Sequence, residues 1–382
     1  MKNALLFLFF VLSFCTLRSQ TDNSKQQAYR FTPLVNLDAT PVKNQSNTGT
    51  CWSFATTSFL ESELLRMGKG EFDLSEMYTV RYNYVNRIKD NYLKAGKGNL
   101  TEGSLSHMMF KVVTEHGMVP EEIYNGISYN SKTHDHGEFN KFINAIAPVA
   151  VESKNKSPEY EKLLNCLLDI YLGKVPENFT YKGKNYTPKS FFVGLGINLN
   201  DYVEITSFSH HPYYSQFVLD IPDNWDSGTY YNLPLDEFIE VINYALKSGH
   251  TVCWDGDMSE KCYSDIAGIA VNATKEELAL ESGKKMDFTK IYQEEEVTRE
   301  SRQKGFETFV TTDDHLMHII GMAKDQNGNI YYIAKNSWRP ETNLQGGYNY
   351  LSEKYVRSKT ISIMVNKIAI PKETRERTGI KL

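Results

Sequence analysis

Apolar residues recur at helical spacing through the first two thirds of the chain and alternate with polar residues in the last third. Helices are predicted for residues 51–67, 105–116, 158–172 and 234–248, each followed by a glycine that ends it, and another begins after the cap residue Ser75. Strands are predicted for residues 251–254, 315–323, 330–335, 346–348 and 361–365. Helices first and strands last is the order of an α+β protein built from two halves.

Two stretches have patterns that are less regular. Residues 178–225 are rich in aromatic residues and proline and have no steady period, so we expect an irregular insertion that wraps on the core. Residues 272–305 are highly charged and are expected to be helical, with the run Glu294–Glu296 on a solvated face.

The N-terminus has the pattern of a secretory signal peptide over residues 1–20. Lys2 precedes an apolar run from Ala4 to Phe14, and Ser19 provides a small residue near the cleavage point. This run is too short to span a membrane stably, and no second apolar run is long enough to do so. We therefore expect an exported protein, periplasmic or secreted, with no membrane span in the mature chain.

Composition limits the possible classes of protein. The chain has 382 residues, of which 41% are hydrophobic, and a formal net charge of −5. This length supports one large domain or two fused halves with an ample core. No basic face is indicated, which argues against a nucleic-acid partner. No cysteine or histidine spacing is typical of a metal site, so neither a metal nor a cofactor is expected.

Five cysteines are spread along the chain, and Cys15 falls within the predicted signal segment. Lipid attachment at Cys15 is disfavoured, because the bulky Phe14 stands where a small residue is required. Cys253 and Cys262 are near enough in sequence to form a disulfide, and buried thiols without a bridge are an equal alternative.

Cys51 follows a Gly-Thr pair and opens the first predicted helix. The free N–H groups at a helix N-terminus carry a partial positive charge of about half a unit, which favours a thiolate over a thiol. Gln45 can place its side-chain amide beside the sulfur as a hydrogen-bond donor. A thiolate next to a preorganised donor is half of an acyl-transfer site. The alternative is a buried structural residue, which is the usual role of a lone cysteine.

The predicted hairpin carries residues that could supply the other half. His315 opens its first strand and Asn336 closes its second, so both lie at its open end. An imidazole can accept the Cys51 proton, and an amide oxygen can hold the other N–H of the ring. His318 is the rival base, and it faces the opposite side of a regular strand. Trp338 could cover the bond between His315 and Asn336 or could belong to the core.

The register of this hairpin decides whether the histidine and the asparagine can meet. A two-residue turn at Asn327–Gly328 would pair Asn336 with Ile319, which is ~13 Å along the strand from His315. That distance is too long for a hydrogen bond. A bulge or an asymmetric loop, which Gly328 permits, must therefore shift the pairing.

These residues resemble the signature of the papain superfamily. The matching segments are Gln45, Gly49–Ala55, Asp314–Met317 with the following Gly321, and Lys335–Trp338. The resemblance implies that Cys51 is the nucleophile, His315 the base, Asn336 the residue that orients the base, and Gln45 the oxyanion donor. In this family a glycine stands six residues after the catalytic histidine, which selects His315 over His318.

The middle of the chain is similar to the branch of this superfamily that contains bleomycin hydrolase and aminopeptidase C. The similar segments are Leu172–Thr180, Lys184–Pro188, Tyr230–Leu235 and Asp257–Met258, within a resemblance that covers most of residues 36–371. It implies a papain-like two-lobed α+β fold with a central insertion, formed by residues 21–382. The expected parts are a helical lobe at about 40–125, the insertion at about 126–235, an antiparallel β-barrel lobe at about 236–371 and a C-terminal tail at 372–382.

The resemblance also implies an activity. The expected function is that of a cysteine peptidase acting on peptide substrates, and the branch suggests an aminopeptidase that could assemble as a homo-hexamer. In this branch the C-terminal tail, here Glu373–Leu382, lies in the substrate cleft, where its carboxylate binds the amino group of the substrate. The alternatives are a secreted papain-like endopeptidase with an open cleft and a non-catalytic peptide-binding protein on the same scaffold.

Overall fold

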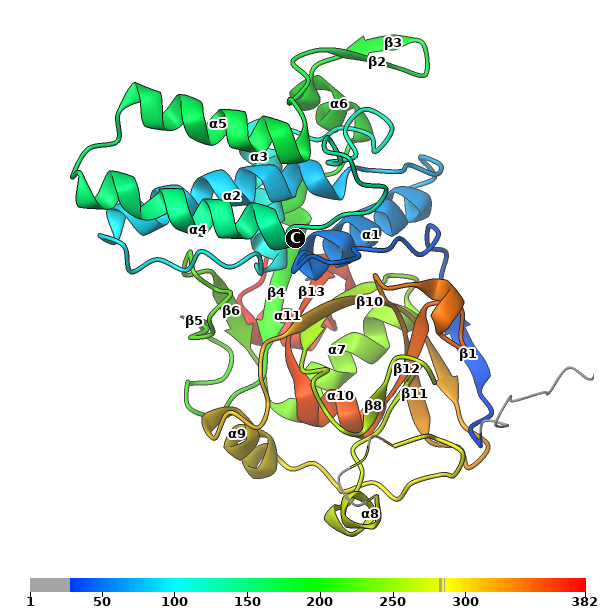
Figure 1. The fold of residues 1–382 in the computed structure, drawn as a ribbon. Helices are drawn as coiled ribbons and strands as arrows, with labels where there is room; N and C mark the ends of the chain where they lie inside the picture. The colour runs from blue at the N-terminus through cyan, green and yellow to red at the C-terminus, as the bar shows by residue number, and fades with distance from the viewer. Residues whose placement is uncertain (1–27, 282–283, 285) are drawn as a thin grey trace, which may run out of the picture.

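The computed structural model describes residues 28–281, 284 and 286–382. The predicted signal segment at residues 1–20 and Cys15 lie outside these residues. The described chain forms two lobes, which lie one above the other in Figure 1, each around its own apolar core. No helix in the described part of the chain has the length and apolarity needed to cross a membrane.

The upper lobe is helical. It contains α1 (Cys51–Arg66), α2 (Glu76–Leu93), α3 (Ser106–His116), α4 (Gly137–Glu152), α5 (Pro158–Leu172) and α6 (Pro188–Leu195), with a small hairpin of β2 (Phe179–Tyr181) and β3 (Lys184–Tyr186). Ser75 and Ser157 are the N-cap residues of α2 and α5. Each side-chain hydroxyl accepts a hydrogen bond at 3.1 Å from a backbone N–H of the first turn. The predicted helices in this lobe are confirmed.

Helix α4 is absent from the sequence prediction. Its first residue is Gly137 and Pro148 lies within it, and both residues normally mark the edge of a helix. Its buried positions nevertheless recur at helical spacing, from Phe139 and Ile143 to Ala147. Packing against α2 and α5 therefore stabilises a helix that local propensity alone does not favour.

The lower lobe is built on an 11-stranded sheet with the order β5-β6-β4-β13-β7-β10-β11-β12-β9-β8 and β1 paired to β10. Its strands are β1 (Thr32–Asn36), β4 (Tyr202–Thr206), β5 (Gln216–Val218), β6 (Thr229–Asn232), β7 (Val252–Gly256), β8 (Tyr263–Ser264), β9 (Ile269–Ala270), β10 (His315–Lys324), β11 (Ile330–Lys335), β12 (Tyr348–Ser352) and β13 (Thr360–Asn366). Its helices are α7 (Leu235–Lys247), α8 (Lys275–Leu280), α9 (Arg299–Glu307), α10 (Glu353–Lys359) and α11 (Lys372–Thr378). Neighbouring strands are antiparallel except for the pairs β4–β6 and β9–β12. The predicted α+β class is confirmed.

Two expectations about irregular segments are wrong in part. Residues 178–225 include β4, an inner strand between β6 and β13, whose alternation is hidden because the buried Glu204 stands in its middle. In the described part of residues 272–305, the helical segments are α8 and the start of α9. Glu294 is not on a solvated face, since its carboxylate accepts a hydrogen bond from the Asn272 backbone at 2.7 Å.

Helix α1 lies at the junction of the lobes. It packs on α2 and α3 in the upper lobe and on β10 and β7 in the lower lobe. The first residue of α1 and the first residue of β10 therefore lie where the two lobes meet, which is where ligands are commonly bound.

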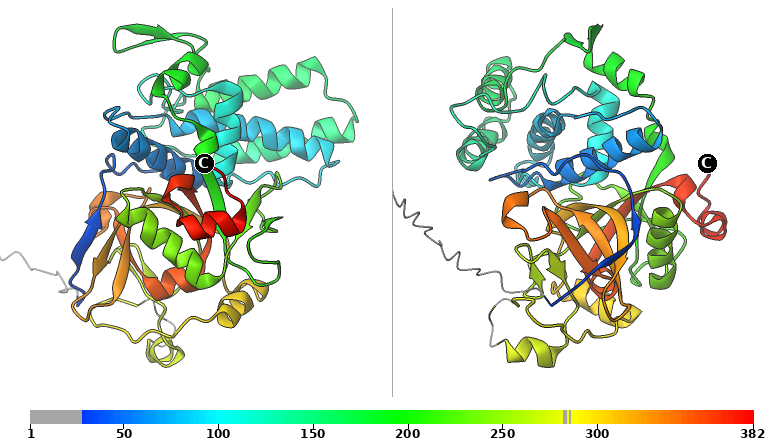
Figure 2. Two further views of the ribbon diagram at one scale, coloured as in Figure 1. Left: turned by 180° about the vertical axis from the view of Figure 1, so that it is seen from behind. Right: turned by 90° about the vertical axis from the view of Figure 1, so that its right-hand side faces the viewer.

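The C-terminal segment lies on the back of the molecule, where α11 runs beside α7 (Figure 2). Arg377 forms an ion pair with Glu237 of α7 at 2.7 Å and stacks over the Tyr214 ring at 3.9 Å. Ile380 is buried in the core of the lower lobe. The expectation that residues 373–382 occupy the substrate cleft is therefore wrong for this structure, because these contacts hold the tail against α7.

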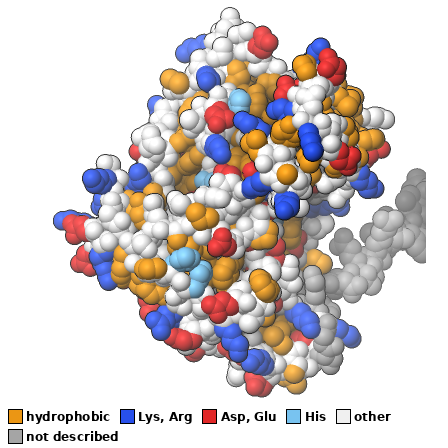
Figure 3. All heavy atoms as spheres, turned by 90° about the vertical axis from the view of Figure 1, so that its left-hand side faces the viewer, with side chains coloured by type: hydrophobic (Ala, Val, Ile, Leu, Met, Phe, Trp, Pro, Cys, Tyr) orange, Lys and Arg blue, Asp and Glu red, His pale blue; other side chains and the backbone are white. Residues whose placement is uncertain are grey.

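Acidic and basic side chains are mixed with apolar ones over the face drawn in Figure 3, and no large patch of one sign covers this face among its described residues. This distribution agrees with the small net charge of −5.

Candidate active site

Cys51 is the first residue of α1, as predicted, and its side chain is largely buried. The Thr50 side chain does not cap the helix, and the Ser53 N–H of the first turn donates to the Thr50 carbonyl at 2.9 Å. Glu102, on the loop before α3, holds this segment in place. Its carboxylate accepts a hydrogen bond from the Gly49 N–H at 2.9 Å, and its carbonyl accepts one from the Trp52 indole at 3.1 Å.

The register of β10 and β11 resolves the problem posed by the hairpin. Asp325 and Asn329 close a three-residue loop, and Gly328 within it has φ +87°. A bulge at Ile320 then adds one residue to β10, between the pairs Ile319–Ala334 and Gly321–Ile333. Together the loop and the bulge shift the pairing by two residues.

The consequence of this shift is that His315 and Asn336 meet. The imidazole Nε2 and the Asn336 Oδ1 are 2.8 Å apart, which places a proton on Nε2 and leaves Nδ1 as the free nitrogen of the neutral ring. Asp265 orients the amide by accepting a hydrogen bond from Asn336 Nδ2 at 3.2 Å. The Trp338 ring lies 4.6 Å from the His315 ring and covers the bond, which is one of the two roles expected for it.

Gln45 is held at both ends of its amide. Its Nε2 donates to the Thr48 carbonyl at 2.7 Å, and its Oε1 accepts from the Ser337 hydroxyl at 2.5 Å. The second hydrogen on Nε2 remains available to a ligand. Gln45, Cys51 and His315 all line one cleft of about 700 Å³, which lies between the lobes.

His318 is not part of this arrangement. Its Nδ1 lies 2.8 Å from the Ser58 hydroxyl of α1, and that hydroxyl also accepts a hydrogen bond from the Lys335 ammonium at 2.8 Å. The Ser58 proton is therefore directed to Nδ1, and full burial lowers the pKa of His318 well below its usual range. His318 is a neutral structural residue on the opposite side of β10, as the alternation of the strand predicts.

Burial is the main influence on the ionisation of Cys51 and His315. It raises the pKa of the Cys51 thiol, while a hydrogen bond from the Leu316 backbone lowers it to a smaller extent. Burial also lowers the pKa of His315. Burial therefore opposes the effect of the helix N-terminus on Cys51, because loss of water favours the neutral form of each group. A charged sulfur requires proton transfer to the neighbouring imidazole.

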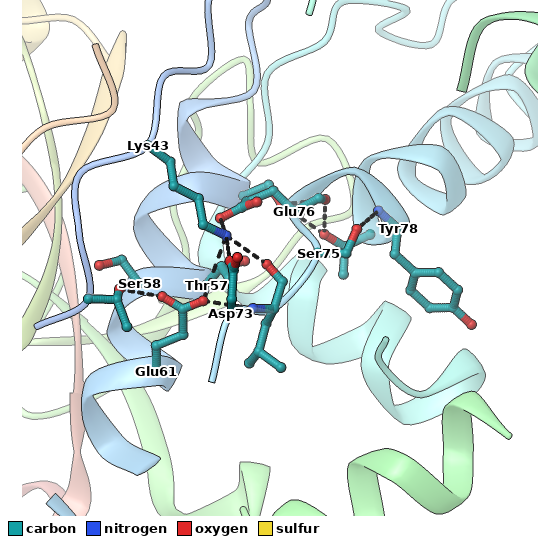
Figure 4. A network of polar contacts seen from close by, with 12 residues as sticks. Lys43, Thr57, Ser58, Glu61, Asp73, Ser75, Glu76 and Tyr78 are labelled. Carbon is teal, nitrogen blue, oxygen red and sulfur yellow. Dashed lines mark hydrogen bonds and ion pairs between the residues drawn. The ribbon is translucent and has the colours of Figure 1, made fainter. Parts of the chain in front are cut away.

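A network of charged side chains links the segment before α1 to α1 and α2 (Figure 4). Lys43 forms ion pairs with Asp73, with Glu76 at 2.9 Å and with Glu61 at 3.8 Å. Glu61 and Lys335 are linked through the hydroxyl of Thr40, to which Lys335 donates at 3.0 Å. Side chains of this network share a small cavity with the segment Asn336–Ser337. The network therefore joins α1 and α2 to the strand that carries the asparagine.

Glu61 makes the stability of this network dependent on pH. Burial raises the pKa of Glu61 from 4.5 to about 7. A carboxyl group with a higher pKa in the folded state costs stability above that pKa, and the cost disappears as the pH falls toward the unfolded value. We expect Glu61→Gln to raise the midpoint of thermal unfolding by a few degrees relative to the parent at pH about 8, and to lose this advantage at pH about 5.

The measurement is thermal unfolding of both proteins across this pH range. The matched control is Glu71→Gln, because Glu71 is exposed in the same lobe. The difference in unfolding midpoint between Glu71→Gln and the parent should stay constant across this pH range. If the difference in midpoint between Glu61→Gln and the parent is also constant with pH, the raised pKa of Glu61 is contradicted.

The remaining cysteines are free among the described residues, so Cys253 and Cys262 do not form a bridge there. Cys253 instead lies 3.3 Å from the Ser106 hydroxyl. Within the described ranges, no group of three or more histidine, cysteine, aspartate or glutamate side chains is arranged to hold a metal ion.

Sequence reasoning located Cys51, His315, Asn336 and Gln45, and the structure places all four at the junction of the lobes. It missed Glu102 and Asp265, which hold the cysteine segment and the asparagine. Neither residue lies in a recognisable motif. Glu102 is more than 50 residues from its partner Gly49, and Asp265 is more than 50 residues from its partner Asn336.

A thiol, an imidazole oriented by an amide, and a fixed amide donor in one cleft between two lobes define a cysteine-dependent acyl-transfer enzyme. A family model described as the Peptidase C1-like family matches residues 13–380. The chain therefore belongs to the peptidase C1-like family and is a cysteine peptidase.

Three relatives illustrate this membership. Aminopeptidase C of Lactococcus lactis subsp. cremoris is 23% identical over 382 residues, covering 89% of this chain and 84% of the relative. The mitochondrial cysteine proteinase 1 of Saccharomyces cerevisiae (strain JAY291) is 21% identical over 406 residues, covering 94% of this chain and 81% of the relative. The crystal structure of PepW from Lactobacillus rhamnosis HN001 has a TM-score of 0.71 at 20% identity, covering 91% of this chain and 84% of that one. The predicted branch and the papain-like fold are thus confirmed.

Proposed function

We propose that this protein is a cysteine aminopeptidase that uses Cys51 as its nucleophile. The observation that carries the proposal is the 2.8 Å bond between His315 Nε2 and Asn336, which leaves Nδ1 free in the cleft that Cys51 lines. The similarity to aminopeptidase C of Lactococcus lactis supports the exopeptidase specificity.

In the proposed reaction, the Cys51 sulfur attacks the carbonyl carbon of the scissile bond while His315 Nδ1 accepts the thiol proton. The oxyanion forms beside Gln45 Nε2 and the Cys51 backbone N–H, which are fixed before the reaction begins. The imidazolium then donates its proton to the departing amine, and a thioester remains on Cys51. A water molecule that loses a proton to His315 hydrolyses the thioester and restores the thiol.

Removal of the oxyanion donor tests the role of Gln45. We expect Gln45→Ala to lower kcat by about 10²–10³-fold with little change in KM, because the donor acts mainly on charge that develops in the transition state. The measurement is steady-state hydrolysis of a chromogenic peptide amide. Gln216→Ala is the matched control, since Gln216 is exposed on β5 and away from the cleft. A proportional rise in KM with unchanged kcat would contradict this role.

A cysteine endopeptidase is the second candidate, because the C-terminal tail lies against α7 and leaves the cleft free of it. The deciding experiment compares an aminoacyl reporter amide with a free amino terminus, its acetylated counterpart and a longer peptide blocked at both ends. The aminopeptidase proposal predicts a preference for the free amine of at least about 10²-fold in kcat/KM. Equal or faster cleavage of the blocked peptides would establish the endopeptidase instead.

A further inference from the structure

An aminopeptidase must recognise the ammonium group of its substrate, and the tail carboxylate is not in position to do so. A different carboxylate, that of Asp223 on the loop after β5, lines the same cleft as Cys51. It lies directly over the backbone of Gly103, since a Cβ added at Gly103 would overlap Asp223 Oδ2. The side chain keeps 23% of its surface exposed, so a ligand in the cleft can reach it.

Two further carboxyl groups stand behind Asp223. Asp255 on β7 pairs with Leu316, the neighbour of His315, and is only 2% exposed. Ser362 donates a hydrogen bond to Asp255 Oδ2 at 3.1 Å. Asp255 and Asp313 also share a side-chain hydrogen bond, and the Asp223 backbone donates one to the Asp313 carboxyl group.

One ion pair lies next to these two carboxyl groups. The guanidinium of Arg87 is the cation beside Asp223, and its Nη2 lies 3.5 Å from Oδ1. Burial, followed by the charge of Asp223, raises the pKa of Asp313 to about 7. Burial and the charge of Asp313 also raise the pKa of Asp255 well above its usual range. Asp255 and Asp313 therefore favour their neutral forms. Asp223 lines the cleft and they do not, so Asp223 is the carboxylate of this group that a cationic ligand there would meet.

The position of this cluster relative to the nucleophile indicates which part of the substrate it meets. His315 must reach the departing amine, so the leaving chain lies on the imidazole side, where Trp338 stands. Beyond Trp338 the cleft continues into a second hollow of about 400 Å³, which Ser46 and Trp338 also line. The acyl part of the substrate therefore lies toward Gly103 and Asp223.

We propose that Asp223 binds the α-ammonium group of the substrate and so restricts the acyl part to a short N-terminal segment. This inference rests on the proposed aminopeptidase function and assigns to an internal aspartate the role that a tail carboxylate was expected to have. Asp223 acts as a specificity residue, because it contacts the substrate away from the reacting atoms.

The test uses Asp223→Asn in the full-length protein, because asparagine keeps the shape of the side chain and removes its charge. Reporter amides with one and with two residues before the scissile bond are each assayed with a free and with an acetylated amino terminus. We expect kcat/KM for the free substrates to fall about 10- to 100-fold, mainly through KM, as loss of a charge-assisted hydrogen bond implies. Hydrolysis of the acetylated substrates should be unchanged or faster.

Asp220→Asn is the matched control, because Asp220 is exposed on the same loop and does not line the cleft. Stoichiometric alkylation of Cys51 in each variant shows that the site is folded. An unchanged ratio of free to acetylated hydrolysis in Asp223→Asn would overturn the inference. A loss confined to blocked peptides with lysine or arginine in the acyl part would also overturn it, by assigning the carboxylates to a basic side chain.

The two proposals fail in different ways. If the parent protein itself shows no preference for a free amino terminus, the aminopeptidase function is wrong. If the parent has that preference and Asp223→Asn retains it, only the assignment of Asp223 is wrong.

Discussion

Replacement of Cys51 by alanine is expected to lower kcat/KM on peptide substrates by at least about 10⁴-fold, because no other group in the cleft can form the thioester. The measurement is hydrolysis of a peptide amide under conditions in which the parent turns over many times. Circular dichroism and thermal unfolding should show that the variant keeps the parent fold, since alanine is compatible with the first turn of α1.

The matched control for this variant is Cys166→Ser. Cys166 is an exposed cysteine on α5, outside the cleft. Its replacement should leave kcat/KM within a factor of about two, as expected for a surface substitution away from the site. Residual activity of Cys51→Ala near the parent level would mean that the acyl transfer proceeds elsewhere.

The second large effect is expected at His315. His315→Ala should lower kcat/KM by about 10³–10⁴-fold, because both the activation of the thiol and the protonation of the leaving amine depend on the imidazole. The double variant with Cys51→Ala should be no less active than Cys51→Ala alone, since the two residues act as one unit. Steady-state kinetics on the three variants checks both statements.

His318→Gln distinguishes the two histidines. His318 hydrogen-bonds Ser58 on the far side of β10, so its replacement should affect thermal stability more than turnover. Activity is expressed per titrated active site to separate the two effects. A large loss of kcat in His318→Gln, together with retained activity in His315→Ala, would assign the role of the base to His318 instead of His315.

The chemistry of the site was predictable because it depends on residue types in a recognisable local order. The segments around Cys51 and His315 indicate the candidate nucleophile and base, and the resemblance to the papain superfamily favours His315 over His318. The long amphipathic helices were also predictable, because their apolar positions repeat over several turns, as in α5 and α7.

The geometry of the site was harder to predict from the sequence than its chemistry. The need for a shift in the hairpin follows from strand spacing, but the position of the bulge at Ile320, next to Gly321, does not. Tertiary contacts decide its position, since β10 pairs with β1 and β7 as well as β11. The inner strand β4 was missed for a related reason. Its central residue Glu204 is polar, and two hydrogen bonds from the distant His107, at 2.7 Å from the ring and 3.2 Å from the backbone, offset the cost of burying it.

The position of the tail and the role of Asp223 depend on contacts between segments far apart in the chain. Arg377 is held by Glu237, 140 residues earlier, and nothing in the local pattern of either residue predicts this pair. Asp223 lies in an insertion without regular periodicity, and it gains meaning only when folding places it over Gly103 in the wall of the cleft.

The most direct test of the central claim is the reactivity of the four cysteines of the described chain toward iodoacetamide at neutral pH. Mass spectrometry at successive times gives the rate of alkylation of each thiol in the parent and in His315→Ala. We predict that Cys51, although only 8% exposed, reacts faster than the exposed Cys166, and that His315→Ala removes this advantage. Faster alkylation of Cys166, or a Cys51 rate that does not depend on His315, would contradict the proposed thiol–imidazole pair.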